Sequence, residues 1–384
     1  MPNYTDLIKA SQSLLKIAVC AKFSFISYMA DISDLLKSYQ NLVENSLEKI
    51  FPRRFNKQQL VNLIGKLRYQ IDEEAIYLTI NKPVWDLLDR GGKRWRPILF
   101  LTILDLLGKD PKSFLDISVI FEVIHNGTLM IDDIEDLSRS RRGKPAVHLL
   151  FGQDVAINAG NMMYFLPLLV LKNYRRKLSK DIMLRLFETY NQEMSALHLG
   201  QATDIGWHAG LVNDFNITKE QYLQMCAFKT GGLARMAAKM AAISAEASDE
   251  TIEAFGQLGE SLGVVFQIQD DLLNITENQL SSMKGLGDDI TEGKRSLPVI
   301  IALSSLAKSK SRRLIKILLM HTNKPELILE AIELIKQGMG IEKSQEIMVK
   351  LFNTAWSKLE PLLKNTDKKD QLYNLARFLV DRKV

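Results

Sequence analysis

Apolar side chains recur every three or four residues along most of the chain, which is the spacing of one face of an α-helix. After Asp181, a suitable N-terminal cap, the period continues as far as Leu197, and residues 251–266 repeat it. Alternating apolar and polar segments are almost missing, and no Asn-Gly or Asp-Gly hairpin joins two of them. The pattern therefore predicts an all-α protein, and it includes residues 119–124, which taken alone resemble a buried strand.

Proline and glycine break the chain into about a dozen predicted helices. No composition shift, low-complexity linker or solenoid repeat divides the sequence after residue 30. We therefore expect one large helical domain over residues 29–384. Residues 1–28 differ, with three lysines, four serines and a single acid. That composition permits a targeting peptide, but we favour a flexible N-terminal extension, with Met29 as an alternative start.

Composition narrows the functional classes. Hydrophobic residues make up 46% and charged residues 25%, which is ordinary for a globular protein. The net charge of +5 suits small anionic ligands and is too modest to indicate nucleic acid binding. The only cysteines, Cys20 and Cys226, argue against a disulfide framework and a cysteine-built zinc site, and favour a cytoplasmic protein. The apolar runs are shorter than the roughly 20 residues of a membrane span, so none is expected.

The sharpest chemical signal is the acidic run Asp132-Asp133-Ile134-Glu135-Asp136. On a helix, Asp132 and Asp136 lie one turn apart on the same face, with Asp133 beside them. Carboxylates this close repel one another unless they share a cation, and Mg²⁺ typically takes one or two carboxylates plus substrate phosphates. For a single run of this kind, a solvated helix face is an equally good interpretation.

A second acidic run, Asp270-Asp271-Leu272-Leu273-Asn274, follows the apolar stretch 262–266. Its acidic side chains are therefore expected to project from a helix that has a buried apolar face. Asp288 and Asp289 come soon afterwards, behind a glycine-containing turn. Two acidic clusters that are each flanked by apolar residues are less typical of a solvated surface. They make a solvated helix face a weaker explanation than binding of cations.

Basic residues alternate with these acids along the chain. A diphosphate bound through metal ions also needs arginine forks or lysine charges for its remaining oxygens. Each basic residue alone is readily explained as surface charge, so the alternation carries the argument. The basic residues concerned are Lys93, Arg94, Arg96, Arg139, Arg141, Arg142, Lys229, Lys284 and Lys294.

Together these residues resemble the trans-prenyltransferases, the family of farnesyl and geranylgeranyl diphosphate synthases, from about residue 84 to residue 302. The sequence looks closest to the geranylgeranyl diphosphate synthases. The matching motifs are Gly91-Gly92-Lys93-Arg94 with Arg96-Pro97, Ile124-His125-Asn126, both acidic runs, Arg141-Arg142-Gly143, Gly200-Gln201 with Asp204, Lys229-Thr230-Gly231, Phe266-Gln267, and Gly293-Lys294 with Pro298.

The resemblance implies a bundle of mostly antiparallel helices around a deep central cavity, usually in a homodimer. It also implies magnesium-dependent condensation of isopentenyl diphosphate with an allylic diphosphate to a linear all-trans prenyl diphosphate. It implies dimethylallyl, geranyl or farnesyl diphosphate as the allylic substrate. It implies no nucleic acid partner.

The resemblance also assigns roles to single residues. Asp132, Asp133 and Asp136 are expected to bind two Mg²⁺ ions, and Asp270 a third, supported by Asp271, Asp288 or Asp289. Thr230 and Gln267 are expected to offer oxygens near the carbocation. The allylic diphosphate is assigned to Arg141, Lys229, Lys294 and Lys284, and isopentenyl diphosphate to Lys93, Arg96, His125 and Arg142. Asn274 departs from the family, since many members have a third aspartate there, so we do not assign it to a metal.

The product is expected to grow along the helix that carries Asp132, between apolar side chains such as Phe121, Leu129 and Phe266. In the family, large aromatic residues four and five positions before this aspartate shorten the product. Here these positions are Thr128 and Gly127, with Val123 and Ile124 a turn deeper. We therefore predict twenty carbons, with longer or fifteen-carbon products open. The floor candidates are Met162, Met163, Tyr164 and Phe165. Close helix packing is the competing interpretation of Gly127.

Two other functions remain at this point. A terpene cyclase also uses an acidic run on helices, but it has no isopentenyl diphosphate to bind, so the basic residues 93–96 argue against it. A non-catalytic partner subunit usually lacks one acidic run, and both are present here. The sequence offers no covalent nucleophile. His125 is expected at the site, whereas His148, His198, His208 and His321 are interpreted as structural or surface histidines.

Overall fold

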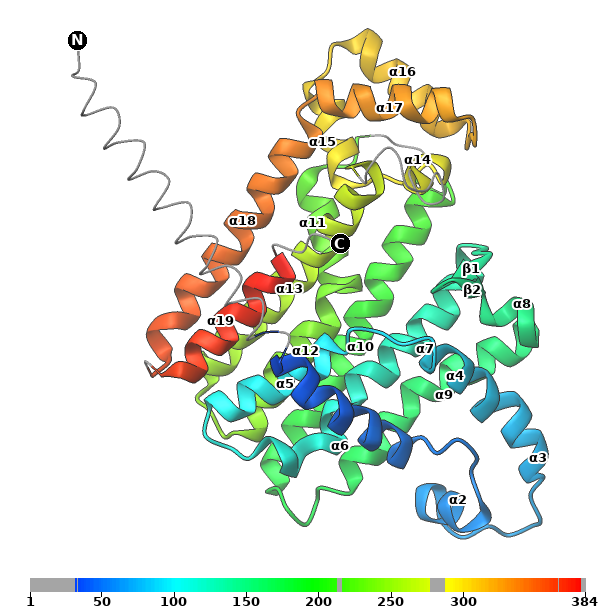
Figure 1. The fold of residues 1–384 in the computed structure, drawn as a ribbon, viewed down its shortest axis with the longest axis vertical. Coiled ribbons are helices and arrows are strands. Elements are labelled where there is room, and N and C mark those ends of the chain that lie inside the picture. Colours follow the sequence, from blue (N-terminus) through cyan, green and yellow to red (C-terminus); the bar gives the residue numbers. More distant parts are fainter. Residues whose placement is uncertain (1–31, 33, 213–215, 277–286, 365, 381–384) are drawn as a thin grey trace, which may run out of the picture.

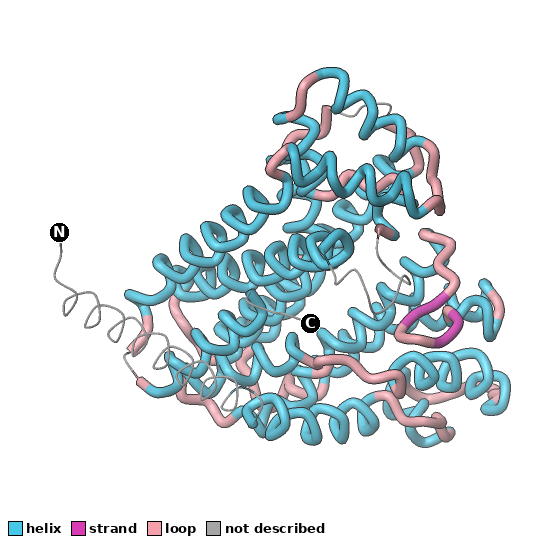
Figure 2. The backbone as a smooth tube through the Cα atoms, turned by 45° about the horizontal axis from the view of Figure 1, so that its top comes forward, coloured by secondary structure: helices cyan, strands magenta, loops and turns pink. Residues whose placement is uncertain are grey.

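The computed structural model of the 384-residue chain describes residues 32–380, except for 33, 213–215, 277–286 and 365. The predicted extension 1–28, with Cys20, lies outside the described residues, as does Lys284. Within the described residues almost every element is a helix, which confirms the all-α prediction (Figure 1). The one sheet described is a hairpin of two-residue strands (Figure 2).

The elements follow one another along the chain with short connections. The first half comprises a helix over residues 34–50, α2 (Lys57–Ile64), α3 (Glu73–Ile76), the π-helix η1 (Tyr77–Asn81), α4 (Lys82–Leu88), α5 (Trp95–Leu106), the 3₁₀ turn η2 (Pro111–Phe114), α6 (Leu115–Ser118), α7 (Ile120–Glu135), β1 (Ser140–Arg141), β2 (Lys144–Pro145), α8 (Val147–Phe151) and α9 (Gln153–Lys172). The second half comprises α10 (Lys180–His208), α11 (Lys219–Lys229), α12 (Gly231–Ser244), α13 (Asp249–Thr276), α14 (Asp288–Thr291), α15 (Leu297–Ser305), α16 (Lys308–Leu319), α17 (Pro325–Gln337), α18 (Gly340–Leu359), the 3₁₀ turn η3 (Glu360–Leu362) and α19 (Asp367–Val380).

Helix α12 lies at the centre of the bundle. Its sequence is rich in alanine and glycine, and nearly all of its residues are buried. A helix that is apolar all round packs against neighbours on every side, and α12 accordingly contacts α5, α10 and α13. Helix α13 extends this contact to α18, while α7 packs along α9. The bundle therefore brings the helices that carry both acidic runs around one centre.

A smaller apolar cluster lies at one end of the bundle, where α14–α17 meet the last turn of α13 (Figure 1). Its buried residues include Ile290, Leu314 and Ile335. The hydroxyl of Thr291 donates to the carbonyl of Thr322 at 3.0 Å, which ties the end of α14 to the segment after α16. This lobe therefore supports the segment that carries Lys294.

Two helical stretches of the described chain are long and apolar enough to cross a membrane, Pro111–Glu135 and Gln153–Lys172. From the lengths of the apolar runs in the sequence, no membrane span is expected. Within the bundle, 61% of the first apolar window and 44% of the second are buried. Core packing accounts for the hydrophobicity of the first stretch, and the second keeps an exposed apolar face on α9.

The break between two helices and the close approach of a third position the site. Helix α11 ends at Lys229 and α12 begins at Gly231, so Thr230 lies at the break between them. Gly200 of α10 makes this arrangement possible, because a Cβ there would collide with the backbone nitrogen of Lys229. The 29-residue helix α10 then continues past Gln201 and Asp204 along the same region.

Candidate active site

A cavity of about 270 Å³ is enclosed by α7, α9, α10, α12 and α13. Its lining includes Asp132 and Asp136 from the first acidic run and Asp270 from the second. The structure therefore brings residues of both acidic runs to one cavity. A larger groove of about 670 Å³ lies between α11, α15 and α18, but none of the predicted site residues lines it.

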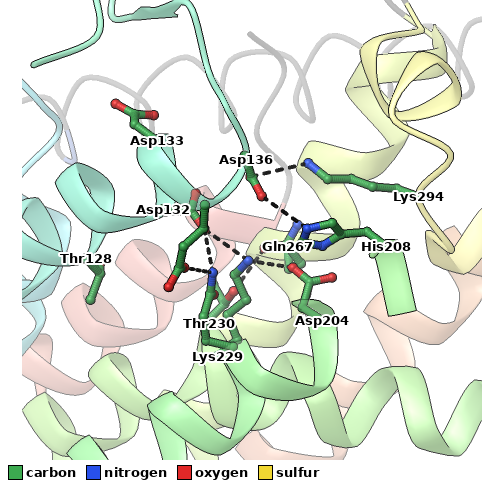
Figure 3. A network of polar contacts seen from close by, with 12 residues as sticks. Thr128, Asp132, Asp133, Asp136, Asp204, His208, Lys229, Thr230, Gln267 and Lys294 are labelled. Atoms are coloured by element: carbon green, nitrogen blue, oxygen red, sulfur yellow. Dashed lines mark hydrogen bonds and ion pairs between the residues drawn. The ribbon is translucent and has the colours of Figure 1, made fainter. Parts of the chain in front are cut away.

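Asp132 is held by hydrogen bonds from two other helices (Figure 3). Its Oδ1 accepts from Lys229 Nζ at 3.2 Å and from Gln201 Nε2 at 3.0 Å. Lys229 Nζ also donates to Asp204 Oδ2 at 2.6 Å. Burial raises the pKa of Asp132, but the lysine charge and the glutamine hydrogen bond outweigh it, and the net pKa is lowered. Asp132 is therefore ionised at neutral pH.

Asp136 lies one helical turn further on and has weaker partners. Lys294 Nζ is 4.0 Å from its Oδ2, and His208 Nε2 is 3.9 Å from its Oδ1. Burial and the neighbouring charge of Asp132 raise the pKa of Asp136 to about 6. A carboxylate that is short of positive charge is favourably placed for a cation.

Asp133 does not reach the cavity. Its carboxylate is fully buried and accepts from Arg141 Nε at 2.8 Å, while its Oδ2 has no hydrogen-bond partner. In Figure 3 it points away from the group formed by Asp132, Asp136 and Lys294. The structure thus places Asp133 against Arg141, and its expected role as a metal ligand stays a prediction. Successive helical residues are about 100° apart, so Asp133 turns away from Asp132 and Asp136 toward Arg141.

The second acidic run divides in the same way. Asp270 is exposed and lines the cavity. Asp271 is buried and accepts from the hydroxyl of Tyr222 at 2.5 Å and from Gln267 Nε2 at 3.0 Å. Burial raises the pKa of Asp271 to about 6, while these hydrogen bonds lower it. These contacts place the carboxylate of Asp271 against donors of the protein, and its expected support for a metal stays a prediction.

Asn274 has a structural role. Its side-chain oxygen accepts from the backbone N–H of Asp289 at 3.2 Å, and its carbonyl accepts from Gly287 at 2.9 Å. It thereby fixes the start of α14. Asp289 lies near Lys294, and burial and the charge of Asp271 raise its pKa to about 8. Asp288 is exposed. Neither Asp288 nor Asp289 lines the main cavity.

Three cations line the polar part of the cavity: Arg141, Lys229 and Lys294. Burial lowers the pKa of Lys229. The charges of Asp132 and Asp204 raise this pKa by more than burial lowers it, so the net pKa lies above the ordinary value. The pKa of Lys294 is also raised, because the charges of Asp289 and Glu292 outweigh the effect of burial. Four residues are predicted to bind the allylic diphosphate. Lys284 lies outside the described residues, and the other three line the cavity and carry a positive charge.

A second basic region lies beside the first. Arg96 and His125 line the cavity, and Arg96 is buried with a guanidinium Nε that has no hydrogen-bond partner among the described residues. Burial lowers the pKa of Arg96 to about 10. Burial and the neighbouring arginines, led by Arg96 and Arg142, hold the pKa of His125 well below its usual range. His125 is therefore neutral, and the region attracts an anion.

Arg142 and Lys93 approach this region from loops. Arg142 donates to the carbonyl of Gly91 and, at 3.2 Å, to Asn126 Oδ1, so it lies behind the cavity lining. Lys93 is exposed in the loop before α5. Arg142 has a φ of 51° and Arg94 a φ of 50°, a conformation that costs a non-glycine residue roughly 1–2 kcal/mol. The buried contacts of Arg94 with Glu44 and Glu122 offset part of this cost.

Thr230 and Gln267 meet inside the cavity, as their predicted role requires. The hydroxyl of Thr230 donates to Gln267 Oε1 at 2.9 Å, and both residues line the cavity. The break between α11 and α12 exposes the threonine hydroxyl, while α13 supplies the glutamine.

The residues expected to limit product length separate into two groups. Thr128 lines the cavity, as do Leu129 and Phe266 among the expected apolar lining and Tyr164 among the floor candidates. Phe121, Val123, Ile124 and Met163 are instead buried in the core, Phe165 is exposed, and Met162 packs at the edge of the core.

Gly127 is a packing glycine. A Cβ at this position would lie 2.8 Å from Met163 Cβ and 3.0 Å from the carbonyl oxygen of Gly160. Helix α7 therefore approaches α9 closely at this point, and the packing interpretation replaces the expectation that Gly127 forms the cavity wall.

Sequence analysis left several site residues without a role. Gln201 and Asp204 were recognised as a matching motif, while His198 and His208 were interpreted as structural or surface histidines. His198 lines the cavity and contacts the Tyr164 ring edge to face at 5.5 Å, and His208 approaches Asp136. The signal that would have found His208 is its spacing, since residues 201, 204 and 208 share one face of a helix.

The fold and the site together define an all-helical protein whose cavity joins carboxylates and cations to an apolar interior. Residues 78–335 match the polyprenyl synthetase family. The chain belongs to this family, which confirms the resemblance to the prenyltransferases.

Individual relatives agree with this assignment. A short chain isoprenyl diphosphate synthase of Methanocaldococcus jannaschii is 33% identical over 328 residues, which cover 85% of this chain and 96% of that protein. A geranylgeranyl pyrophosphate synthase of Eremothecium gossypii is 35% identical over 241 residues, or 62% of this chain and 73% of that protein. The solved structure of geranylgeranyl pyrophosphate synthetase from Pyrococcus horikoshii superimposes with a TM-score of 0.78 at 26% identity, and covers 93% of this chain and 100% of that one.

Proposed function

We propose that this protein condenses isopentenyl diphosphate with an allylic diphosphate to give linear all-trans geranylgeranyl diphosphate. The observation that carries the proposal is the single cavity lined by Asp132, Asp136 and Asp270 together with Lys229 and Lys294. The names of its relatives, short chain isoprenyl and geranylgeranyl diphosphate synthases, support the reaction and the product.

We further propose Mg²⁺ as the cofactor, with three ions by resemblance to the family. Asp132 and Asp136 would hold the ions at one wall and Asp270 an ion at the other. Among the described residues no three His, Cys, Asp or Glu side chains form a complete metal site. A Mg²⁺ ion that is completed by diphosphate oxygens needs only one or two carboxylates from the protein, so the donor set fits. When bound, Mg²⁺ supplies positive charge to the departing diphosphate.

The positively charged side chains of the cavity stabilise the same negative charge on the departing diphosphate. Breaking the allylic carbon–oxygen bond leaves negative charge on the diphosphate. Lys229 is held by Asp132 and Asp204, and Lys294 approaches Asp136, so both ammonium groups are already oriented. Donors fixed in advance stabilise developing charge without reorganising during the reaction. Arg141 joins them at the cavity lining.

The second basic region suits the diphosphate of isopentenyl diphosphate. Arg96 offers an unpaired buried Nε–H, and neutral His125 beside it offers an N–H without adding charge. This feature disfavours a terpene cyclase, which binds one diphosphate. The presence of acids at both walls disfavours a non-catalytic partner subunit.

The apolar part of the cavity supports a twenty-carbon product. Leu129, Leu233 and Phe266 would exclude water from the allylic cation. The small side chain of Thr128 leaves room below Asp132, and Tyr164 closes the cavity against His198. We propose Tyr164 as a residue that limits chain length.

We also propose a homodimer in the cytoplasm. Ile157 and Phe165 lie two turns apart on α9 and are 39% and 66% exposed, while Leu184 and Leu199 of α10 are 57% and 60% exposed. Exposed apolar faces of this kind are typical of subunit interfaces. The described cysteine, Cys226, is a buried free thiol, which supports a reducing location.

The test is product analysis. The purified chain is incubated with labelled isopentenyl diphosphate, Mg²⁺ and dimethylallyl, geranyl or farnesyl diphosphate in turn, and the dephosphorylated products are separated by chromatography. We expect label in geranylgeraniol with each active starter and none after EDTA is added. A product without label would favour a cyclase, and a single labelled product of another length would correct the chain length alone.

A further inference from the structure

Asp271 is surrounded by donors from three helices. Its Oδ2 accepts from the hydroxyl of Tyr222 at 2.5 Å and lies 3.4 Å from the backbone N–H of Leu297, and its Oδ1 accepts from Gln267 Nε2 at 3.0 Å. Tyr222 and Asp271 are 2% and 6% exposed. The oxygens of Asp271 are thus engaged by the protein itself, while the neighbouring Asp270 is exposed and lines the cavity.

These contacts fix the orientation of an amide that faces the cavity. An ionised carboxylate can only accept hydrogen bonds, so Gln267 must turn its NH₂ group toward Asp271. Its carbonyl oxygen then lies on the other side, where it accepts from Thr230 at 2.9 Å. Tyr222, Asp271, Gln267 and Thr230 therefore form one chain of hydrogen bonds that ends in the cavity.

The orientation of this amide has an electrostatic consequence. A carbonyl oxygen presents the negative end of the amide dipole, whereas a flipped amide would present the positive NH₂ group. A dipole aimed in advance at the place where charge develops contributes strongly to catalysis, and removing one such group typically costs about 10²–10³ in kcat. The charge that develops beside Gln267 in the proposed reaction is the allylic carbocation.

We propose that Asp271 is a positioning residue, held by Tyr222, that keeps the carbonyl oxygen of Gln267 directed into the cavity, and that it binds no metal ion. This inference rests on the proposed function. It separates the two adjacent aspartates by role, with Asp270 directed at the metal and Asp271 at the amide.

The first test compares Asp271→Asn with Asp270→Asn. In Asp271→Asn the introduced amide can keep its oxygen on Tyr222, and its NH₂ group then faces Gln267 and drives that side chain to flip. We expect kcat to fall about 10²-fold, with KM for both substrates within about twofold of wild type. Calorimetric titration of Mg²⁺ in the presence of inorganic pyrophosphate should match wild type for Asp271→Asn and be weaker for Asp270→Asn. Equal weakening in the two variants would make Asp271 a metal ligand and overturn the inference.

The second test is rescue. In Gln267→Glu alone, two carboxylates face each other, and turnover should be low. In the double variant Gln267→Glu/Asp271→Asn, the introduced asparagine donates its NH₂ group to the introduced glutamate, which again directs an oxygen into the cavity. We expect kcat at least tenfold above that of Asp271→Asn, a non-additivity that a purely structural role of Asp271 would not produce. A double variant no better than Asp271→Asn would overturn the inference.

A third variant keeps the test decisive if Asp271→Asn does not fold. Tyr222→Phe preserves the packed ring and removes only the hydroxyl. It should lower kcat several-fold and leave Mg²⁺ binding unchanged, and an unchanged kcat would contradict the chain of hydrogen bonds. Wild-type turnover in the same assay tests the proposed function separately: no turnover removes that function, whereas turnover without the variant effects removes only the role of Asp271.

Discussion

The two acidic runs look alike in sequence, yet the structure uses their residues differently. Each contains an adjacent pair of aspartates, Asp132-Asp133 and Asp270-Asp271. In each pair the first side chain lines the cavity and the second is buried against a donor of the protein. The cause is helical geometry, because adjacent residues point about 100° apart. An acidic run therefore predicts where a metal site lies, but it does not give the number of ligands.

The runs also differ in their fifth residue. Asp136 returns to the cavity one turn after Asp132, whereas Asn274 binds the backbone of Asp289 and builds the turn before α14. The first wall thus offers Asp132, Asp136 and the intervening Glu135, and the second wall offers Asp270. This asymmetry fits a site in which the first wall binds most of the metal-bound diphosphate.

The largest effect is expected from Asp132→Ala, with Asp133→Asn as its matched partner. Asp132 faces the cavity and lies beside Lys229, so its loss should reduce kcat by about 10³. Asp133→Asn weakens only the contact that holds Arg141, and roughly a tenfold loss is expected. Steady-state kinetics at saturating Mg²⁺ measure both. Equal losses would break the distinction between the two aspartates.

A smaller effect, on product length, is expected from Tyr164→Ala. Removal of this ring opens the cavity toward His198, and the main product should lengthen by at least one isoprene unit. Phe165→Ala is the matched control, because this neighbouring side chain is 66% exposed and is not part of the cavity lining. Chromatography of the dephosphorylated products gives the answer. An unchanged length in Tyr164→Ala, or a change in the control, would remove Tyr164 from the floor.

Gly127→Ala should destabilise the fold without shortening the product. The added Cβ meets Met163 and Gly160 of α9, and overpacking of this kind costs about 1–3 kcal/mol. Gly206→Ala on α10 is the control, because a Cβ there meets no atom within 4 Å, and it should be neutral or slightly stabilising. Denaturant titration measures the difference. A fully stable Gly127→Ala variant with a shorter product would restore the glycine to the cavity wall.

The smallest effect is a pH dependence of stability in metal-free buffer. The raised pKa of Asp289, about 8, means that the folded protein keeps a proton that the unfolded chain has already lost. The folded state binds more protons, so stability falls as pH rises toward 8. Asp136 and Asp271, each near 6, act with the same sign at lower pH.

Asp289→Asn should therefore flatten the decrease in melting temperature between pH 6 and pH 8. Asp288→Asn removes only the smallest of the charges that raise the pKa of Asp289, so it should keep most of the slope of wild type. A slope that is unchanged in Asp289→Asn would show that this carboxyl does not titrate in the window given by its pKa.

The fold and the general location of the site were predictable, because both depend on patterns that are local in sequence. Helical periodicity indicated the bundle, and the acidic and basic runs indicated where its chemistry lies. The direction of each side chain was not predictable, because it depends on contacts with distant residues. The side chain of Asp271 turns inward because it accepts a hydrogen bond from Tyr222. The two residues are 49 positions apart in the chain, so this pairing leaves no local signal in the sequence.

Gly127 and His208 illustrate the same limit. A small residue near an acidic run is equally compatible with open space and with close packing, and only the position of Met163 on α9 decides between them. His208 was overlooked because a single histidine carries little information, although its spacing from Gln201 and Asp204 placed it on the cavity side of α10.

The most direct test of this account is a crystal structure with Mn²⁺ and inorganic pyrophosphate, in which anomalous scattering locates each metal ion. We predict metal ions bound by Asp132 and Asp136 at one wall and by Asp270 at the other, with Asp133 still on Arg141 and Asp271 still on Tyr222. A metal ion bound by Asp133 or Asp271 would contradict the account.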